Sequence, residues 1–374
     1  MIPRFYEDLE KYIDPNKVLV IYGSRQVGKT TLLNNYLSRT KLKYKLDSGD
    51  NIKIQEILSS ENFEKIIEYA SGYELLAIDE AQKIPKIGLG LKILVDQIPG
   101  IKIIATGSSS FELAGQVGEP LTGRKRTITL YPLSQIELAK LYNPYELKEK
   151  LKDFLIFGSY PDVLNAKTKI EKIKVLEELI NSYLLKDILD LKKVKSSKIL
   201  RNLLLLIAFQ IGKEVSLTEL GTKLGLDYKT VAKYLDLLEK SFIIYNLIGF
   251  SRNLRKEITK NSRYYFYDNG IRNALINNFN SIDLRDDVGM LWENYIITER
   301  IKKQTYNKIF SNNYFWRTYD KKEIDWIEER EGKLFGYEIK WTKDKTKIPQ
   351  EWLKTYSEAT FQVINKENYL DFIG

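Results

Sequence analysis

Short apolar runs and amphipathic stretches alternate along the first third of the chain. Residues 18–22 are apolar and rich in β-branched side chains, which is typical of a buried strand. A helix pattern follows from Thr31, and further strand patterns occur at 75–80 and 101–106. Strands that alternate with helices predict an α/β fold for this part of the chain.

The pattern changes in the middle of the chain. Residues 134–192 are helical in pattern and suit a small helical lid. A polar, basic interruption at 192–198 marks a domain boundary. Residues 216–235 then give a helix, a short turn and a second helix, and 241–248 is an apolar strand pattern. This order predicts a winged helix-turn-helix domain.

The last part of the chain returns to a mixed pattern. A helix pattern begins at Gly289, and strand patterns follow at 314–319, 323–327 and 334–340. The chain is therefore predicted to divide into four units, with the boundaries 1–133, 134–192, 193–262 and 263–374.

The stretch between the first strand and the first helix carries the most specific motif. Residues 23–30 are Gly-Ser-Arg-Gln-Val-Gly-Lys-Thr, which matches G-x-x-x-x-G-K-[ST] in the strand–loop–helix context of a phosphate-binding loop. Backbone N–H groups at a helix N-terminus attract an anion. Lys29 is expected to reach the β- and γ-phosphates of ATP, and the Thr30 hydroxyl to bind Mg²⁺. An ordinary glycine turn would not require the lysine and the hydroxyl.

Two acids end the next apolar strand. Asp79 is expected to help Thr30 hold Mg²⁺, and Glu80 to orient the attacking water. The alternative is that both are surface acids at a strand end. Together with the loop they complete the expected nucleotide site, which comprises Gly23, Ser24, Arg25, Gln26, Val27, Gly28, Lys29, Thr30, Thr31, Asp79 and Ser108.

Polar and basic residues farther along are candidates with open alternatives. Ser108 is the expected polar group between the acids and the γ-phosphate, with Thr106 as the second choice, although a helix N-cap at Ser110 also explains this turn. Arg124, favoured over Arg126, is the candidate catalytic arginine that reaches a neighbour's nucleotide. A solvated basic loop is an equally good explanation.

Composition narrows the chemistry. The chain has no cysteine and no histidine, so thiolate zinc sites and disulfides are excluded, and oxygen ligands favour Mg²⁺ or Mn²⁺. A net charge of +9 permits nucleic-acid binding without requiring it. No apolar run approaches the ~20 residues of a membrane span. The start of the chain also lacks a signal-peptide core, so a cytoplasmic protein without a membrane partner is expected.

The C-terminal unit contains a second candidate site. Asp325 lies in one strand pattern, and Glu338 and Lys340 share one face of the next. Two carboxylates and a lysine can hold Mg²⁺ and activate water for phosphodiester cleavage, and Glu293 could add a further polar group. The set resembles the Asp…Glu-x-Lys signature of the restriction-endonuclease-like fold. The alternatives are a fold retained for binding alone, or a salt bridge between Lys340 and an acid.

The helix-turn-helix pattern offers a surface for DNA. Its second helix is expected to expose Tyr228, Lys229 and Lys233. The basic stretch 252–263, which contains Arg252, Arg255, Lys256, Lys260 and Arg263, supports a DNA-binding role. The alternative is a winged helix that only packs between domains.

Several motifs together resemble one family. The chain is similar to the AAA+ superfamily ATPases of archaea and bacteria that carry an uncharacterised C-terminal region, and the resemblance covers nearly the whole chain. That family usually has Gly-Gly-Tyr-Pro where this chain has Gly-Ser-Tyr-Pro at 158–161. The motifs that carry the resemblance are 23–30, 75–82, 105–110, 121–124, 131–134, 158–161 and 265–270.

The residues and the resemblance lead to three hypotheses. The first is an α/β protein with a P-loop AAA+ ATPase core and lid that acts on DNA through a winged helix and a nuclease-like domain. The second is an ATP-linked DNA nuclease. The third is a nucleotide-dependent regulatory switch without cleavage. The expected partners are ATP, DNA and either further copies of the chain or another protein.

Overall fold

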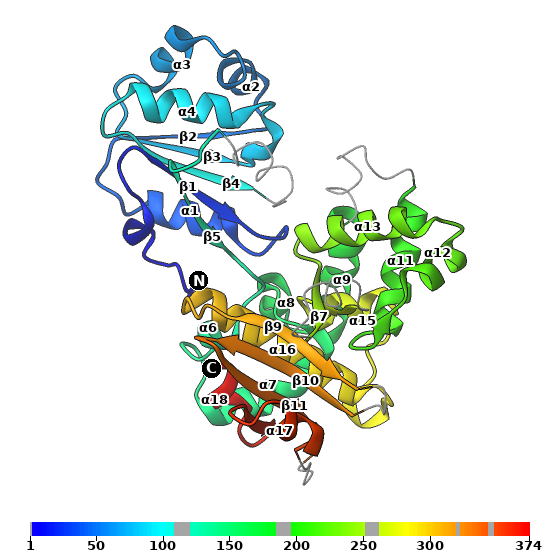
Figure 1. The fold of residues 1–374 in the computed structure, drawn as a ribbon. Coiled ribbons are helices and arrows are strands. Elements are labelled where there is room, and N and C mark those ends of the chain that lie inside the picture. The colour runs from blue at the N-terminus through cyan, green and yellow to red at the C-terminus, as the bar shows by residue number, and fades with distance from the viewer. Residues whose placement is uncertain (1, 108–119, 185–195, 251–261, 319–321, 343–347) are drawn as a thin grey trace.

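The computed structural model describes residues 2–107, 120–184, 196–250, 262–318, 322–342 and 348–374. In these residues the chain forms two sheets that are connected by helices (Figure 1). The first sheet has five strands and the second has seven. The expected α/β architecture is therefore confirmed. In the described part of the chain, no helix is both long enough and apolar enough to cross a membrane.

The first sheet is entirely parallel, in the order β2-β3-β4-β1-β5. Helix α1 covers one face and helices α2 to α4 cover the other (Figure 1). The alternation of side chains explains this, since Leu19 packs in the cluster that contains Leu32 of α1, and Val20 packs in the cluster that contains Leu91 of α4. The elements are β1 Lys17–Tyr22, α1 Lys29–Leu37, β2 Tyr44–Ser48, α2 Ile52–Leu58, α3 Phe63–Ala70, β3 Leu75–Asp79, α4 Ile87–Gln97, β4 Lys102–Gly107 and β5 Lys125–Thr129.

A group of helices follows the first sheet, as the pattern predicts for 134–192. Three of them begin with a complete capping box, at Ser134, Asn143 and Thr168, and α8 begins with Pro161. The expected boundary at 192–193 lies outside the described residues. The helices are α6 Gln135–Leu138, α7 Pro144–Phe157, α8 Pro161–Asn165 and α9 Lys169–Glu178, and a π-helical stretch, Leu179–Leu184, continues from α9.

The next segment contains the helix–turn–helix expected from the sequence. Asp227 caps α13 by accepting the N–H of Thr230, and Gly225 ends α12 with a positive φ of 67°. The elements are α11 Ser197–Phe209, β6 Glu214–Val215, α12 Leu217–Leu224, α13 Tyr228–Lys240, β7 Ile244–Gly249 and β8 Ser262–Phe266.

The C-terminal strands extend the same sheet. Strand β7 pairs in parallel with β9, so the second sheet runs β12-β11-β10-β9-β7-β8-β6. The boundary proposed between residues 262 and 263 therefore falls inside β8. The remaining elements are α15 Asn269–Leu275, α16 Val288–Tyr306, β9 Asn312–Arg317, β10 Glu323–Arg330, β11 Lys333–Ile339, α17 Gln350–Thr355, β12 Thr360–Ile364 and α18 Tyr369–Ile373.

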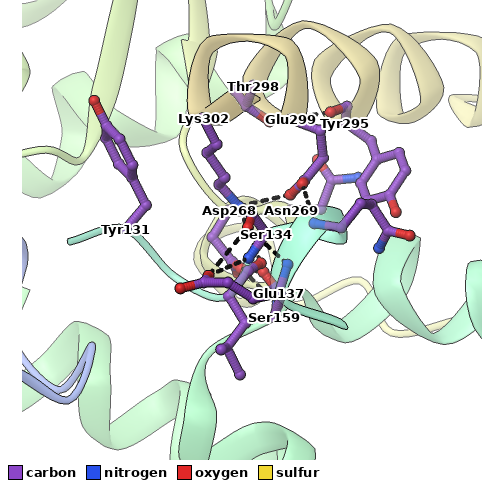
Figure 2. Close-up of polar contacts among 12 residues, drawn as sticks. Tyr131, Ser134, Glu137, Ser159, Asp268, Asn269, Tyr295, Thr298, Glu299 and Lys302 are labelled. Atoms are coloured by element: carbon purple, nitrogen blue, oxygen red, sulfur yellow. Dashed lines mark hydrogen bonds and ion pairs between the residues drawn. The ribbon is translucent and has the colours of Figure 1, made fainter. Parts of the chain in front are cut away.

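A buried polar junction, which consists of Gln135, Ser159, Asp268, Glu299 and Lys302, connects this group of helices, called the lid below, to α15 and α16. Figure 2 shows Ser159, Asp268, Glu299 and Lys302. The Ser159 N–H donates to Oδ2 of Asp268 over 2.7 Å, and Oε2 of Glu299 accepts the N–H of Gln135 over 2.7 Å. The Lys302 ammonium lies 2.6 Å from Oε1 of Glu299. Each buried charge thus has a polar partner, which burial of a charge requires.

Gly270 lets α15 approach α7 at this junction. A Cβ atom at this position would lie 2.1 Å from the carbonyl oxygen of Phe157. We predict that Gly270→Ala lowers the free energy of unfolding by about 1–3 kcal/mol, because the backbones must separate. Urea unfolding followed by tryptophan emission measures this.

Gly289→Ala is the matched control, since Gly289 is also the second residue of its helix and nothing lies within 4 Å of its Cβ position. We expect that variant to leave stability unchanged or to raise it by up to about 1 kcal/mol. Equal stability of the two variants would contradict the close contact at Gly270.

Candidate functional site

The phosphate-binding loop predicted at 23–30 lies at the carboxyl end of β1 and leads into α1. Its backbone has positive φ angles at Gly23, Gln26 and Gly28, of 153°, 57° and 93°. A Cβ atom on Gly23 would lie 2.1 Å from the carbonyl oxygen of Leu130, so a side chain is excluded there. The start of α1 follows directly, and a helix N-terminus is a favourable place for an anion.

Lys29 lies inside this loop. Its side chain is buried, and its ammonium group donates to the carbonyl oxygens of Gly23, over 2.9 Å, and Ser24, over 2.7 Å. A positive charge is therefore held where loop N–H groups and a helix N-terminus also favour negative charge. Phosphate groups of a nucleotide fit this combination of donors.

Thr30 and Asp79 lie together, although β4 separates β1 from β3 in the sheet. The Thr30 hydroxyl donates to Oδ2 of Asp79 over 2.8 Å. Thr106, near the end of β4, donates its hydroxyl to Oδ1 of Asp79 and accepts the N–H of Glu80 over 3.1 Å. The end of β4 and the start of α1 thus both contact the carboxylate at the end of β3. A hydroxyl and a carboxylate oxygen are ligands that suit Mg²⁺.

Glu80 follows directly with a left-handed backbone, at a φ of 51°. Its carboxylate accepts the side-chain amide of Gln82 over 2.7 Å, which holds its orientation. Sequence reasoning did not assign a role to Gln82. Ser108, the expected polar group beside the acids, lies outside the described residues. Thr106, the second choice, is the residue that contacts both acids here.

Tyr160 reaches the loop from the lid. Its hydroxyl lies 3.1 Å from the Ser24 hydroxyl, within hydrogen-bond distance, and its side chain is buried. Tyr160 directly precedes α8, so this contact joins the lid to the loop. Sequence reasoning gave Tyr160 no role, although the Gly-Ser-Tyr-Pro motif at 158–161 was the available signal.

A cavity of about 240 Å³ adjoins the loop on the side of the lid and the start of the chain. Its lining is mostly apolar and also includes amide, carboxylate and guanidinium groups. The residues that line it include Ile2, Pro3, Val27, Thr31, Asn35, Leu133, Pro161, Asp162 and Asn165.

Arg124 lies far from this site. The N–H of Val18, at the start of β1, donates to the carbonyl oxygen of Arg124 over 2.9 Å. The loop follows the other end of β1, so Arg124 is at the opposite edge of the sheet. Its Nε lies 2.6 Å from Oδ1 of Asp96. Arg124 therefore does not contact the nucleotide site of its own chain.

The second candidate site lies between β10 and β11. The register that pairs Trp326 with Tyr337 places Asp325 opposite Glu338, and both carboxylates are buried. Oδ2 of Asp325 accepts the N–H of Ile339 over 2.9 Å. Among the described residues, Oε2 of Glu338 has no hydrogen-bond partner. The structure thus brings together the two acids that the sequence singled out.

Lys340 lies 2.7 Å from Oε1 of Glu338, so the salt bridge that was the alternative to a cleavage site is present. Burial, followed by the charge of Asp325, raises the pKa of Glu338 to about 7. The same two causes raise the pKa of Glu293 to about 8. Glu293 lies in α16 and accepts the Tyr265 hydroxyl over 2.7 Å. These acids lie close enough together that each disfavours the charge of the next.

Arg263 corrects one expectation from the sequence. It was grouped with an exposed basic stretch, but its side chain is buried and lies 2.7 Å from Oε2 of Glu323 and 3.9 Å from Oδ1 of Asp325. Strand β8 turns it toward the acids. The other basic residues of that stretch, 252–260, lie outside the described residues.

The acids do not form a large metal cluster. In the described part of the chain, no group of three or more Asp, Glu, His or Cys side chains has a geometry that could hold a metal ion. Asp325 and Glu338 would supply two carboxylates to an ion, with water as the remaining ligands, as Mg²⁺ commonly accepts.

Helix α13 presents the surface that the sequence predicts. Tyr228 is 55% exposed, and Lys229 and Lys233 are exposed on the same helix. Val231, Tyr234 and the leucines of α13 face the core, so the exposed side chains belong to the opposite face.

Three families match successive parts of the chain. Residues 15–139 match the family described as AAA domain, 148–282 match a domain of unknown function, DUF8612, and 288–368 match a domain of unknown function, DUF4143.

Several relatives match most of this chain at low sequence identity. An uncharacterised protein of Haemophilus influenzae is 25% identical and is matched over 90% of this chain and 85% of its own length. The uncharacterised protein Rv2008c of Mycobacterium tuberculosis is 24% identical, over 87% of this chain and 70% of its own. The uncharacterised protein MJ1544 of Methanocaldococcus jannaschii is 25% identical, over 94% of this chain and 80% of its own length.

Two solved structures are similar to this chain with low scores. The Walker-type ATPase PABY2304 of Pyrococcus abyssi is 17% identical with a TM-score of 0.47, over 72% of this chain and 93% of its own. The replication initiator DnaA, bound to AMPPCP and single-stranded DNA, is 19% identical with a TM-score of 0.27. The match covers 62% of this chain and 85% of the DnaA chain. Because these scores are low, the assignment rests on the family match. Residues 15–139, which match the family described as AAA domain, contain Lys29, Thr30, Asp79 and Glu80.

Proposed function

We propose that this protein is a Mg²⁺-dependent ATPase of the AAA+ superfamily that acts on DNA. The observation that carries the proposal is the set of hydrogen bonds that joins Thr30, Asp79 and Thr106 beside the buried ammonium group of Lys29. A hydroxyl and a carboxylate suit a metal ion, and an ammonium group beside them suits the phosphates to which that ion is bound.

Each residue of this site has a defined task in the proposed reaction. The loop N–H groups and Lys29 bind the phosphates, and Thr30 and Asp79 hold Mg²⁺. Glu80, oriented by Gln82, accepts a hydrogen bond from the attacking water. Mg²⁺, when bound, supplies positive charge beside the phosphate oxygens.

The cavity beside the loop suits the base of the nucleotide. Val27, Leu133 and Pro161 give it apolar walls, against which a purine ring can pack. Asn35 and Asn165 add amide groups to its lining. Ligand pockets commonly combine such walls with a few polar groups.

Arg124 requires a second copy of the chain to take part in catalysis. It lies at the sheet edge opposite the loop, where its guanidinium is paired with Asp96. In an oligomer this edge can face the nucleotide of a neighbouring copy, and the arginine would then act in trans. This role implies that ATP turnover depends on assembly.

Glu80→Gln tests the ATPase proposal. We predict that ATP turnover falls about 100-fold or more, because an amide is a poor acceptor for a proton from water. ATP binding should change little, since Lys29 and Thr30 are intact. Phosphate release and calorimetric ATP binding measure the two properties.

Glu68→Gln, an exposed acid of α3 in the same domain, is the control and should behave like wild type. Undiminished turnover in Glu80→Gln would contradict its role. A wild-type protein that binds ATP without turnover would instead support the regulatory switch.

The buried acids favour a second function, metal-dependent cleavage of DNA. The favouring observation is Oε2 of Glu338, which is buried without a hydrogen-bond partner among the described residues and lies opposite Asp325. A bound metal ion would satisfy this oxygen. The order α16, β9, β10, β11, α17, β12 supports the resemblance to a restriction-endonuclease-like domain.

The exposed face of α13 is the proposed DNA-binding surface. Lys229 and Lys233 can contact phosphates there, and Tyr228, at the start of the helix, lies where recognition helices contact bases. Strand β7, which follows α13, pairs with β9 in the same sheet as Asp325. DNA bound at α13 would therefore lie on the part of the protein that carries the acids.

Asp325→Asn tests the cleavage. We predict that the cleavage of supercoiled DNA with Mg²⁺ or Mn²⁺ falls at least about 10- to 100-fold, because the substituted side chain loses the charge that holds the metal. ATP turnover should be unaffected, since the nucleotide site is on the other sheet.

Glu329→Gln, in the same strand but distant from Glu338, serves as the control and should cleave like wild type. Equal cleavage by Asp325→Asn and wild type would refute this site. No cleavage by either, with ATP turnover intact, would leave a domain that binds without cutting.

The raised pKa values of Glu293 and Glu338 predict a pH dependence of stability. Their pKa values rise from 4.5 to about 8 and about 7 in the folded chain. At pH values between the unfolded and the folded pKa, the folded chain binds more protons than the unfolded chain. The free energy of unfolding therefore falls as pH rises through this range. We predict that the melting temperature falls between about pH 6 and about pH 8.5, and that the fall is smaller in Glu293→Gln.

Mg²⁺ or Mn²⁺ should raise the melting temperature more at the higher pH, because the ion binds the deprotonated carboxylates. Thermal unfolding with and without the ion measures both effects. An identical pH slope in wild type and Glu293→Gln would show that Glu293 does not carry this dependence.

A further inference from the structure

The contact between Ser24 and Tyr160 joins the phosphate loop to the lid. Ser24 contributes two groups, since its carbonyl oxygen accepts the Lys29 ammonium over 2.7 Å and its hydroxyl lies 3.1 Å from the Tyr160 hydroxyl. A phosphate bound by Lys29 would interact with the same ammonium group that the Ser24 carbonyl oxygen accepts. Nucleotide binding therefore acts directly on the residue that holds Tyr160.

The residue before Tyr160 is fixed to the other half of the protein. The Ser159 N–H donates to Oδ2 of Asp268 over 2.7 Å (Figure 2). Oδ1 of Asp268 accepts the Ile271 N–H over 3.2 Å and thereby caps α15. Gly158 has no room for a side chain, because a Cβ atom would lie 1.9 Å from Oδ1 of Asp268. A displacement of Tyr160 is thus transmitted to the start of α15.

Helix α15 is bonded in turn to α16. The side-chain amide of Asn269 donates to the carbonyl oxygen of Leu291 over 3.0 Å. The side-chain amide of Asn294 donates to Oδ1 of Asn269 over 2.6 Å. Trp292 and Glu293 lie between these two contact points on α16. The connection from Lys29 to Glu293 is therefore an unbroken series of hydrogen bonds and adjacent residues.

We propose that Tyr160 is a positioning residue that couples the phosphate loop to α16, so that binding of a nucleoside triphosphate changes the surroundings of Trp292 and Glu293. The proposal rests on the nucleotide binding proposed above. The Tyr160 hydroxyl is the point at which the coupling can be broken, since a phenylalanine keeps the packed ring and loses the hydrogen bond. Binding at either end then biases the other, because such coupling is reciprocal.

The tryptophans of the chain allow a direct measurement. All five lie between residues 292 and 352, and the phosphate loop has none. Trp292 is fully buried on α16, and its ring contacts Trp341 and Tyr369. A change in tryptophan emission on nucleotide binding therefore reports on the second sheet and its helices.

The experiment titrates the full chain with AMPPCP and Mg²⁺, and it measures heat and tryptophan emission in parallel. We expect wild type to show both signals. Tyr160→Phe should keep the heat of binding and lose most of the emission change, because one such hydrogen bond shifts an equilibrium by about 5-fold. Ser24→Ala removes the other hydroxyl of the same contact, so it should reduce the emission change equally, and the double variant should reduce it no further.

Tyr36→Phe is the matched control. Tyr36 is also buried and also loses one hydrogen bond, to Glu10, but it lies at the far end of α1 from the loop. It should keep the full emission change. A general loss of stability would reduce the emission change in Tyr36→Phe and Tyr160→Phe alike, so a difference between them points to the Tyr160 contact.

Two results would overturn the coupling while leaving nucleotide binding intact. One is heat of binding in wild type without any emission change. The other is a full emission change in both Tyr160→Phe and Ser24→Ala. An absence of binding heat in wild type would overturn the proposed function and the coupling together.

Discussion

The carboxylate of Asp268 is the group on which the contact between the lid and the second sheet depends. It is buried, and burial raises the pKa of its carboxyl, while N–H groups and the charge of Lys302 oppose that rise. A buried carboxylate needs such donors, and the main ones come from Ser159 on one side and from α15 on the other. The two parts can therefore satisfy this charge only when they are together. The polar junction thus selects one arrangement of packed helices over others of similar apolar area.

The geometry of the proposed nucleotide site was largely predictable because its signals are local. Lys29 and Thr30 belong to one short motif, and Asp79 and Glu80 end one apolar strand. The carboxyl ends of parallel strands meet at one edge of a sheet, so the sequence alone indicated that these residues would lie together. The structure places Thr30 and Asp79 in hydrogen-bond contact. Thr106 was only the second choice, because the pattern favoured Ser108, two residues later.

The surroundings of the buried acids were only partly predictable. Asp325 and Glu338 were found, since alternation along two neighbouring strands is a local pattern. Arg263 was misplaced, because neighbouring basic residues suggested an exposed patch, and only the pairing of β7 with β8 and β9 shows which way it faces. Tyr160 was missed for a similar reason. Its partner Ser24 is far away in the sequence, and no local pattern encodes a contact of that kind.

The parallel pairing of β7 with β9 also limits which parts of such a chain can be exchanged in evolution. The boundary between the two matched families of unknown function falls after β8 and before β9. Those families therefore share one hydrogen-bonded sheet, and a gene that lost either of them would leave β7 or β9 as an open edge. The first sheet has no strand in common with the second. Recombination can thus exchange the ATPase-like domain more readily than it can separate the two families that follow it.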